Sequence, residues 1–274
     1  MDGLLVTRFA PAPTGYLHLG HVVNARHVWQ AAREAGGRVL LRIEDHDRQR
    51  CRPEYERAML EDLEWLGFTP DDVSRQSERH AVYEEALEEL RRQGLVYACD
   101  CPRAALTEHE PGTDGERRYP GTCRGRGVPE GPGTGLRVRL DPAIVRFDDL
   151  RRGPQTQCPS EQCGDLLVRD RLGNWTYQFV AAVDDFRQGV TLVIRGDDLL
   201  ASTGRQIQLA RMLGRSEPPR FLHHALVMKS PHQKLSKSDG DTGIRDLRAR
   251  GWSRDEVLAT ARENPAPGHR VLPV

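Results

Sequence analysis

The first 43 residues constrain the fold more than any other part of the chain. An apolar run at Leu4 to Phe9 is followed by a loop rich in glycine and proline, PAPTGYLHLGH, and then by apolar residues at helical spacing from Val22 to Glu34. Two glycines close that helix, and a second apolar run follows at Arg38 to Ile43. A strand–helix–strand unit joins two parallel strands through a right-handed crossover. The sequence therefore predicts an α/β fold built on a parallel sheet.

Beyond this unit the pattern alternates between helical and extended stretches. Helices are predicted at 53–66, 80–93, 202–213 and 253–262, and strands at 136–140, 166–169 and 191–194. Between 94 and about 135, cysteine, glycine and proline occur without any period. That segment is predicted to be either disordered or a small unit held together by something other than an apolar core.

The charge and hydropathy of the chain limit the classes of partner that it can be expected to bind. The 274 residues contain 40 Lys+Arg and 40 Asp+Glu. There is thus no overall attraction for nucleic acid, and an RNA partner would need a local basic surface. No apolar run approaches the roughly 20 residues that span a bilayer, and the start MDGLLVTRFA has no signal-peptide pattern. We therefore expect a soluble, cytoplasmic protein with no membrane partner.

The HLGH segment, His18 to His21, lies where the first strand gives way to the first helix. Backbone N–H groups and the helix dipole make such a position favourable for phosphate. Gly20 lets the backbone approach a bulky ligand, and the two histidines can donate hydrogen bonds to phosphate oxygens whose charge rises during displacement. Two solvated loop histidines are the alternative, because a four-residue match is common by chance.

A second polar motif, KLSKS at Lys234 to Ser238, favours the phosphate interpretation. Its flanks, SPHQ and DGDTG, predict a mobile loop outside any helix or strand. The ammonium groups of Lys234 and Lys237 suit a triphosphate, where they can close over the pyrophosphate and offset the charge of the leaving group. Alone, this motif is typical of two solvated lysines, but together with HLGH it indicates a nucleotide site.

Three of the six cysteines, Cys99, Cys101 and Cys123, lie in the segment without a period. A structural zinc site needs four tetrahedral ligands, so this set is one ligand short. By spacing alone the fourth ligand is His109 or a water, and three unligated thiols are the alternative. Zinc is favoured because little else would order so glycine-rich a segment.

Together these motifs resemble the class I aminoacyl-tRNA synthetases, in which HLGH near the N-terminus is paired with KLSKS. The phrases RFAPAPTGYLHLGH, LRIEDHD, YQFVAAVDD and RGDDLLASTGRQ resemble the glutamyl type, and the resemblance extends from about Arg8 to about Asp239. It implies a Rossmann-type catalytic domain that uses L-glutamate and ATP with Mg²⁺. The residues implied at the ATP and catalytic site are His18, Gly20, His21, Lys234 and Lys237.

The same resemblance implies a glutamate pocket formed by Arg8, Ala12, Glu44, Tyr177 and Arg195. Two guanidiniums suit a substrate with two carboxylates, and Glu44 would face its α-ammonium group. Ala12 departs from the family pattern, which often has serine, so no side-chain hydrogen bond arises there. The alternatives are a surface ion pair between Arg195 and a nearby aspartate, Asp197 or Asp198, and a solvated turn position for Glu44.

Within the family, the spacing Cys-x-Cys and Tyr-x-x-x-Cys resembles the zinc subdomain of the glutamyl-queuosine tRNA(Asp) synthetase subfamily. It implies one structural zinc ion, Zn²⁺, with the ligands Cys99, Cys101, Tyr119 and Cys123. The remaining Cys-x4-Cys pair, Cys158 and Cys163, has no further ligands nearby in the sequence and is interpreted as ordinary thiols.

The subfamily resemblance also implies a domain organisation. We expect the first half of the catalytic domain at 1–94, a zinc-binding insert at 95–135, the rest of the insert and the return to the catalytic domain at 136–200, the second half with KLSKS at 201–240, and a short helical segment at 241–274. Because only 36 residues follow Ser238, no anticodon-binding domain is expected. The expected partner is the anticodon stem-loop of tRNA(Asp) bearing queuosine, whose cyclopentene-diol would accept the glutamyl group from glutamyl-adenylate.

Three other functions remain open at this point. A minimal glutamyl-tRNA synthetase that charges a tRNA 3′ end would need an anticodon domain in this chain or in a partner. A small-molecule adenylyltransferase would share HxGH, but it does not account for KLSKS together with the glutamyl-type phrases. A catalytically inactive RNA-binding module is disfavoured because both nucleotide motifs are intact.

Overall fold

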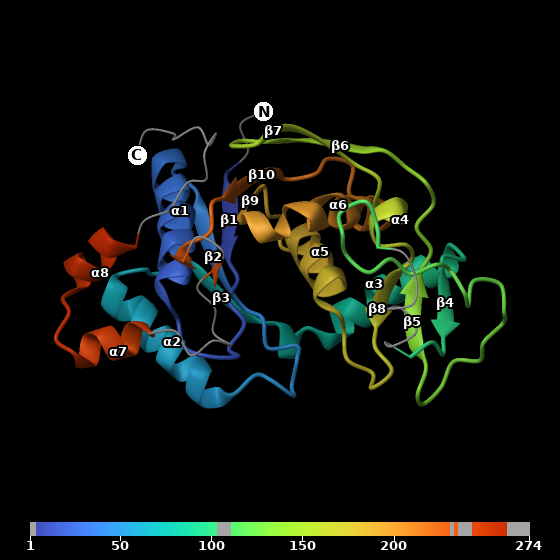
Figure 1. Ribbon diagram of the computed structural model, residues 1–274, viewed down its shortest axis with the longest axis horizontal. Coiled ribbons are helices and arrows are strands. Elements are labelled where there is room, and N and C mark those ends of the chain that lie inside the picture. The colour runs from blue at the N-terminus through green and yellow to red at the C-terminus, as the bar shows by residue number, and fades with distance from the viewer. Residues whose placement is uncertain (1–3, 103–110, 231–232, 235–242, 262–274) are drawn as a thin grey trace.

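The computed structural model describes residues 4–102, 111–230, 233–234 and 243–261. Within these residues the centre of the molecule is a seven-stranded sheet in the order β3-β2-β1-β9-β10-β6-β7 (Figure 1). Its strands are β1 (Val6–Phe9), β2 (Arg38–Ile43), β3 (Asp72–Arg75), β9 (Leu192–Gly196), β10 (Arg220–His224), β6 (Val145–Asp149) and β7 (Gly153–Gln157). All neighbours pair in parallel except β6 and β7, which form an antiparallel hairpin. The predicted α/β fold with a mainly parallel sheet is confirmed.

The side on which successive strands are added to the sheet changes at β1, although β1 itself is parallel to both of its neighbours. From β1 the chain builds outward through β2 and β3, and it later returns on the other side of β1 as β9 and β10. In open parallel sheets, ligands bind beyond the carboxyl ends of the strands at such a reversal. The HLGH segment follows the carboxyl end of β1, so the fold places it at this position.

Helices pack around the sheet and contribute to separate apolar cores. They are α1 (Leu19–Ala35), α2 (Pro53–Leu66), η1 (Gln76–Glu78), α3 (His80–Arg92), α4 (Pro159–Gln162), α5 (Tyr177–Arg187), η3 (Asp197–Ser202), α6 (Thr203–Met212), α7 (Ile244–Ala249) and α8 (Arg254–Thr260). Figure 1 shows α1, α2, α7 and α8 gathered at one end of the molecule, where they share a core with β1 and β2. A second core joins α3, α5 and α6. Helix α1 ends because Gly36 adopts φ 58°, a left-handed conformation that glycine reaches without strain.

A small antiparallel sheet lies at the opposite end of the molecule (Figure 1). It consists of β4 (Val96–Cys99), β5 (Gly135–Val138) and β8 (Leu166–Arg169), in that order. The segment without a sequence period connects β4 to β5. Its described part therefore starts and ends on the same sheet, and this sheet packs on α3 and α5 through the second core.

Two sequence expectations change. Helix α1 begins at Leu19 instead of Val22, so the last three residues of HLGH belong to the helix and His18 is its N-cap. KLSKS was expected to lie outside any element, but Lys234 belongs to the short strand β12 (Gln233–Lys234), which pairs with β11 (Met228–Ser230). The expectation is wrong for Lys234, because its backbone pairs with Met228 of β11, a contact that side-chain polarity does not reveal. Residues 235–238 of the motif, Lys237 included, lie outside the described residues.

Among the residues that the structure describes, no helix combines the length and the apolar character that crossing a bilayer requires.

Candidate active site

Hydrogen bonds to backbone N–H groups hold the two histidines of HLGH in place at the start of α1. His18 is the N-cap, and its Nδ1 accepts a hydrogen bond from the backbone N–H of Gly20 at 3.1 Å. Nδ1 of His21 accepts in turn from the backbone N–H of His18 at 3.1 Å, and the ring centroids are 3.9 Å apart. Since both Nδ1 atoms accept, the proton of each neutral ring is on Nε2. The motif thus assembles two imidazole N–H donors beside the N-terminus of a helix.

Gly20 is required by the position of the His18 ring. A Cβ atom at residue 20 would lie 2.9 Å from Cε1 of His18 and 3.1 Å from its Nδ1. Any larger residue would therefore push the imidazole away from the helix terminus and break its cap. The sequence analysis assigned Gly20 to close approach of a ligand, and the structure adds close approach of the neighbouring histidine.

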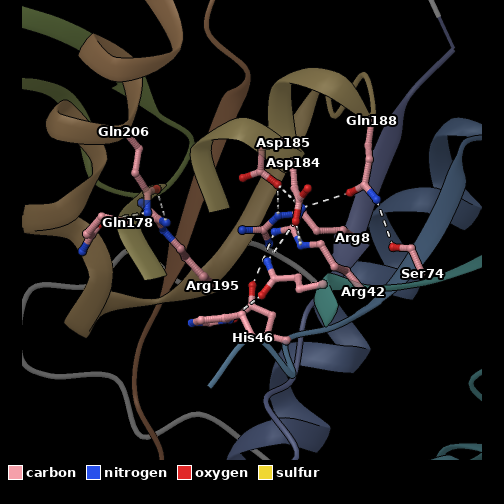
Figure 2. A network of polar contacts seen from close by, with 12 residues as sticks. Arg8, Arg42, His46, Ser74, Gln178, Asp184, Asp185, Gln188, Arg195 and Gln206 are labelled. Atoms are coloured by element: carbon pink, nitrogen blue, oxygen red, sulfur yellow. Dashed lines mark hydrogen bonds and ion pairs between the residues drawn. The ribbon is translucent and has the colours of Figure 1, made fainter. Parts of the chain in front are cut away.

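The carboxyl ends of the parallel strands carry a buried network of charged side chains. Asp185 of α5 accepts a hydrogen bond from Nε of Arg8 at 3.0 Å and one from Nη1 of Arg42 at 2.8 Å. Arg42 also lies 3.5 Å from Glu44 and 3.8 Å from Asp184, which pairs with Arg79. Figure 2 shows Arg8 of β1, Arg42 of β2 and the two aspartates of α5, Asp184 and Asp185, converging. The network contains three guanidiniums and three carboxylates, so its charges balance.

The predicted glutamate-site residues lie within electrostatic reach of one another. Glu44, only 7% exposed, follows β2, and burial raises its pKa although Arg42 and Arg8 oppose that shift. Tyr177 begins α5, and burial, followed by the charge of Glu44, raises the pKa of its phenol. Arg195 of β9 interacts with both Tyr177 and Arg8. The alternative of a solvated Glu44 is thereby excluded.

Arg195 differs from the other arginines of the site in its partners. Its side chain is 3% exposed, and three of its N–H groups donate to neutral acceptors. These acceptors are Nε2 of His223 at 3.0 Å, Oε1 of Gln206 at 2.7 Å and Oγ1 of Thr203 at 2.9 Å. Among the side chains that the structure describes, no carboxylate forms an ion pair with Arg195, and the alternative of a surface pair with Asp197 is wrong because Asp197 pairs with Arg152.

Ala12, Lys234 and Lys237 are the remaining predicted residues of the two sites, and the structure describes them to different extents. Ala12 lies in the loop between β1 and HLGH, where its carbonyl oxygen accepts from the N–H of Thr14 at 2.9 Å. The backbone of Lys234 is in β12, and Lys237 lies outside the described residues. The structure thus brings together Arg8, Glu44, Tyr177 and Arg195.

The cysteines of the insert converge in the small sheet. The Sγ atoms of Cys99, Cys101 and Cys123 lie within 4.8 Å of one another. The hydroxyl of Tyr119 is 3.4 Å from Sγ of Cys99 and accepts the backbone N–H of Cys123 at 2.8 Å. Tetrahedral zinc at about 2.3 Å from each sulfur sets sulfur atoms roughly 3.8 Å apart. Three converging thiols and one phenol oxygen therefore fit a closed zinc site, and His109, the alternative ligand, lies outside the described residues.

Arginines near the insert hold it together. Arg137 stacks on the ring of Tyr119, with its Cζ 3.6 Å from the ring centroid, and donates to the carbonyl of Asp165 at 2.8 Å. The Asp165 carboxylate pairs with Arg124 and accepts the backbone N–H of Leu140 at 2.9 Å. Both arginines thus have structural partners inside the protein.

Sequence reasoning missed several residues of the site: Arg42, Asp149, Asp184, Asp185 and His223. Three of these left a signal, because Arg42 interrupts the otherwise apolar run RVLLRI and Asp184 and Asp185 end the apolar run of YQFVAAVDD. A charge in a buried strand or helix face needs a partner, which indicates a network. His223 and Asp149 gave no comparable signal, since only the sheet order brings their strands together.

Comparisons with known proteins identify the family of this chain. The family model described as tRNA synthetases class I (E and Q), catalytic domain, matches residues 4–262. A glutamyl-Q tRNA(Asp) synthetase of Rhodobacter capsulatus is 40% identical over an alignment that covers 92% of this chain and 98% of that protein. For the protein of the same name from Thiobacillus denitrificans, identity is 42%, with 96% and 87% covered.

Full-length ligases are matched over a smaller share of their own length. A glutamate–tRNA ligase of Frankia casuarinae is 37% identical, and the match covers 92% of this chain but 54% of that protein. Among solved structures, a glutamate tRNA ligase from Elizabethkingia meningosepticum, in complex with its amino acid, superposes with a TM-score of 0.76 at 27% identity. That match covers 93% of this chain and 64% of the ligase chain, so the present chain spans less than two thirds of that ligase.

Proposed function

This chain belongs to the family of class I tRNA synthetase catalytic domains of the E and Q type, and from that premise we propose that it activates L-glutamate with ATP and transfers the glutamyl group to queuosine in tRNA(Asp). The family supports the ligase chemistry. The charge of the pocket supports glutamate as the amino acid. The acceptor is supported by the names of relatives, three of which are matched over 82% to 98% of their own length.

The observation that carries the proposal is the buried guanidinium of Arg195, which forms no direct ion pair with a carboxylate among the side chains that the structure describes. A guanidinium remains protonated in proteins, even though burial lowers the pKa of Arg195. A buried charge is costly unless an opposite charge accompanies it. Asp149 reaches Arg195 only through His223, so the guanidinium can still pair directly with a carboxylate of the substrate. The side-chain carboxylate of glutamate supplies that partner, whereas the neutral amide of glutamine does not.

The other pocket residues complete a plausible orientation of this substrate. The side-chain carboxylate binds Arg195, and the α-ammonium group lies against Glu44. Arg8 keeps its place because Asp185 and the carbonyl of Ile194 hold its Nε and Nη1. This leaves the α-carboxylate directed toward the loop that carries HLGH, which follows the same strand as Arg8.

Adenylation then requires alignment and charge stabilisation more than a base. An α-carboxylate oxygen attacks the α-phosphorus of ATP, the bond to the β-phosphate breaks, and pyrophosphate leaves. The Nε2–H groups of His18 and His21 and the α1 N-terminus donate to phosphate oxygens as their charge increases. Lys234 and Lys237 stabilise the leaving pyrophosphate, and Mg²⁺, which accompanies ATP, offsets part of the phosphate charge.

Transfer follows by attack of a queuosine hydroxyl on the carbonyl carbon of glutamyl-adenylate, which releases AMP. In this proposal Cys99, Cys101, Tyr119 and Cys123 would hold a zinc ion. That ion would be structural: it would tie the end of β4 to Tyr119 and Cys123 and take no part in the reaction.

The test uses radiolabelled glutamate, ATP and two matched tRNA(Asp) preparations, one with queuosine and one with guanosine at the wobble position. Glutamate-dependent ATP–pyrophosphate exchange, together with label on the queuosine-bearing tRNA alone, is the expected result. Equal labelling of both preparations would move the acceptor to the tRNA 3′ end and refute queuosine transfer. An absence of exchange with glutamate would refute the activation step itself.

A further inference from the structure

Three neighbouring strands hold a buried chain of side chains that ends on Arg195. Asp149 closes β6, His223 lies on β10, and Arg195 lies on β9 next to His223 in the sheet register. Nδ1 of His223 is 2.7 Å from Oδ2 of Asp149, and Nε of Arg195 is 3.0 Å from Nε2 of His223. The side chains of His223 and Asp149 are fully buried, at 0% exposure.

The hydrogen bonds permit one tautomer of His223. Nε of Arg195 can only donate, so Nε2 of His223 has to accept. Asp149 can only accept when ionised, so Nδ1 has to carry the proton. The opposite tautomer would set two donors against each other at one end of the ring and two acceptors at the other. His223 is therefore neutral and oriented, and it presents an acceptor to the guanidinium.

Asp149 is itself fixed by the backbone. Its Oδ1 accepts the N–H groups of Arg151 at 2.9 Å and Arg152 at 2.8 Å, and its Oδ2 accepts the N–H of His223 at 3.1 Å. Although burial opposes ionisation, the hydrogen bonds from His223 and from the backbone lower the pKa of Asp149. The far end of the chain is thus a carboxylate that stays charged and does not rotate.

From this geometry, and resting on the function proposed above, we infer that His223 is a positioning residue: held by Asp149, it aims the Arg195 guanidinium at the side-chain carboxylate of the substrate and so favours glutamate over glutamine. His223 holds Nε, while Gln206 and Thr203 hold the two Nη atoms from α6. Because all three acceptors are neutral, they fix the plane of the guanidinium without neutralising the charge that the substrate needs.

Protonation of His223 would reverse this effect. The imidazolium would lose its acceptor and place a positive charge against Arg195. The charged groups that act on His223 are Asp149 on β6, Arg195 on β9 and Asp197 on η3, and Thr203 adds a neutral hydroxyl at 3.3 Å. Burial, assisted by Arg195, lowers the pKa of His223 despite the bond to Asp149. Glutamate affinity is therefore expected to fall as the pH drops below the ordinary histidine pKa of about 6.5.

Three variants test the inference in glutamate-dependent ATP–pyrophosphate exchange on the full chain. His223→Leu removes the acceptor, His223→Gln replaces Nε2 with an amide oxygen that cannot titrate, and His80→Gln is the control at a histidine on the surface of α3. For His223→Leu we expect KM for glutamate to rise at least 10-fold, with a smaller change in kcat, an unchanged KM for ATP and a lower preference for glutamate over glutamine. His223→Gln should recover most of the affinity, and His80→Gln should behave as the wild type.

The pH profile separates positioning from a merely structural role. Glu44 and the substrate also titrate, so the readout is the difference between the wild type and His223→Gln. As the pH falls below about 6.5, the wild type should lose affinity for glutamate more steeply than His223→Gln. Should His223→Leu fail to fold, Asp149→Asn, which leaves the histidine tautomer unfixed, is expected to raise KM for glutamate as well.

If the wild type shows normal glutamate-dependent exchange, either of two results would overturn the inference about His223 and leave the proposed function standing. One is a wild-type KM and amino-acid preference in His223→Leu. The other is an equal loss in His223→Leu and His223→Gln with matching drops in melting temperature and parallel pH profiles. If the wild type shows no glutamate-dependent exchange, the proposed function fails, and the inference fails with it.

Discussion

Replacement of Arg42 by methionine should destabilise the protein far more than the same change at Arg38. Both arginines belong to β2, and each pairs with an aspartate at 2.8 Å: Arg42 with Asp185, and Arg38 with Asp72. The difference is burial, because the Arg42 side chain is 0% exposed and that of Arg38 is 47% exposed. The pair is thus a matched comparison of one interaction in two environments.

The expected loss of folding stability depends on which carboxylates each substitution leaves without a cation. Without Arg42, Asp185 keeps Arg8 and Asp184 keeps Arg79, but Glu44 loses its nearest cation and all three carboxylates remain buried. Removing one partner of a buried charge pair costs about 3–5 kcal/mol. Losing the exposed Arg38 pair costs at most about 1 kcal/mol. For a chain of this size the Arg42 change corresponds to a drop of roughly 6–15 °C in melting temperature.

Urea unfolding of wild type, Arg42→Met and Arg38→Met, followed by circular dichroism at several pH values, measures both costs. Loss of Arg42 raises the folded-state pKa of the abandoned carboxylates, so the folded variant binds protons more readily than the folded wild type. The destabilisation of Arg42→Met should therefore shrink as the pH falls from 7 toward 4, while that of Arg38→Met stays small. Equal destabilisation of the two variants, or a cost that does not depend on pH, would refute the reasoning.

Three further predictions concern the ligand sites. Gly20→Ala should reduce ATP–pyrophosphate exchange at least 10-fold, because the added Cβ displaces the His18 ring. Its stability in urea should stay nearly unchanged, since the lost cap and the gained helix propensity are each about 1 kcal/mol and oppose each other. Normal exchange would contradict the role of that ring. Glutamate binding should release protons at acidic pH and progressively fewer as the pH rises, because burial raises the pKa of Glu44 and a bound ammonium lowers it again. Calorimetry in buffers of different ionisation enthalpy measures this release, and Glu44→Gln should release fewer protons than the wild type. Elemental analysis should find about one zinc per wild-type chain and per Cys158→Ser chain but little in Cys123→Ser, whereas metal-free wild-type protein would rule out the zinc site.

Local patterns in the sequence were sufficient for the regular elements. The strand at Arg38–Ile43 and the helix at Pro53–Leu66 have the predicted bounds, because their apolar period and their terminal glycine or proline act within a few residues. The β6–β7 hairpin was missed: its strands are short, and the partner that buries β6 is β10, more than 70 residues away in sequence. Polar residues on β6 and β7 conceal a pairing that depends on this distant neighbour.

For the candidate site, the sequence alone identified residue types that act through their own backbone neighbourhood or through recognisable phrases, such as HLGH, the three cysteines and Arg195. Only the tertiary structure decided which charges neutralise each other. Arg8 is balanced by Asp185, 177 residues away in sequence, whereas Arg195 is surrounded by the neutral acceptors His223, Gln206 and Thr203. Electrostatic energy depends on distance and burial in space, and both are set by the order of the strands in the sheet, which no local pattern records.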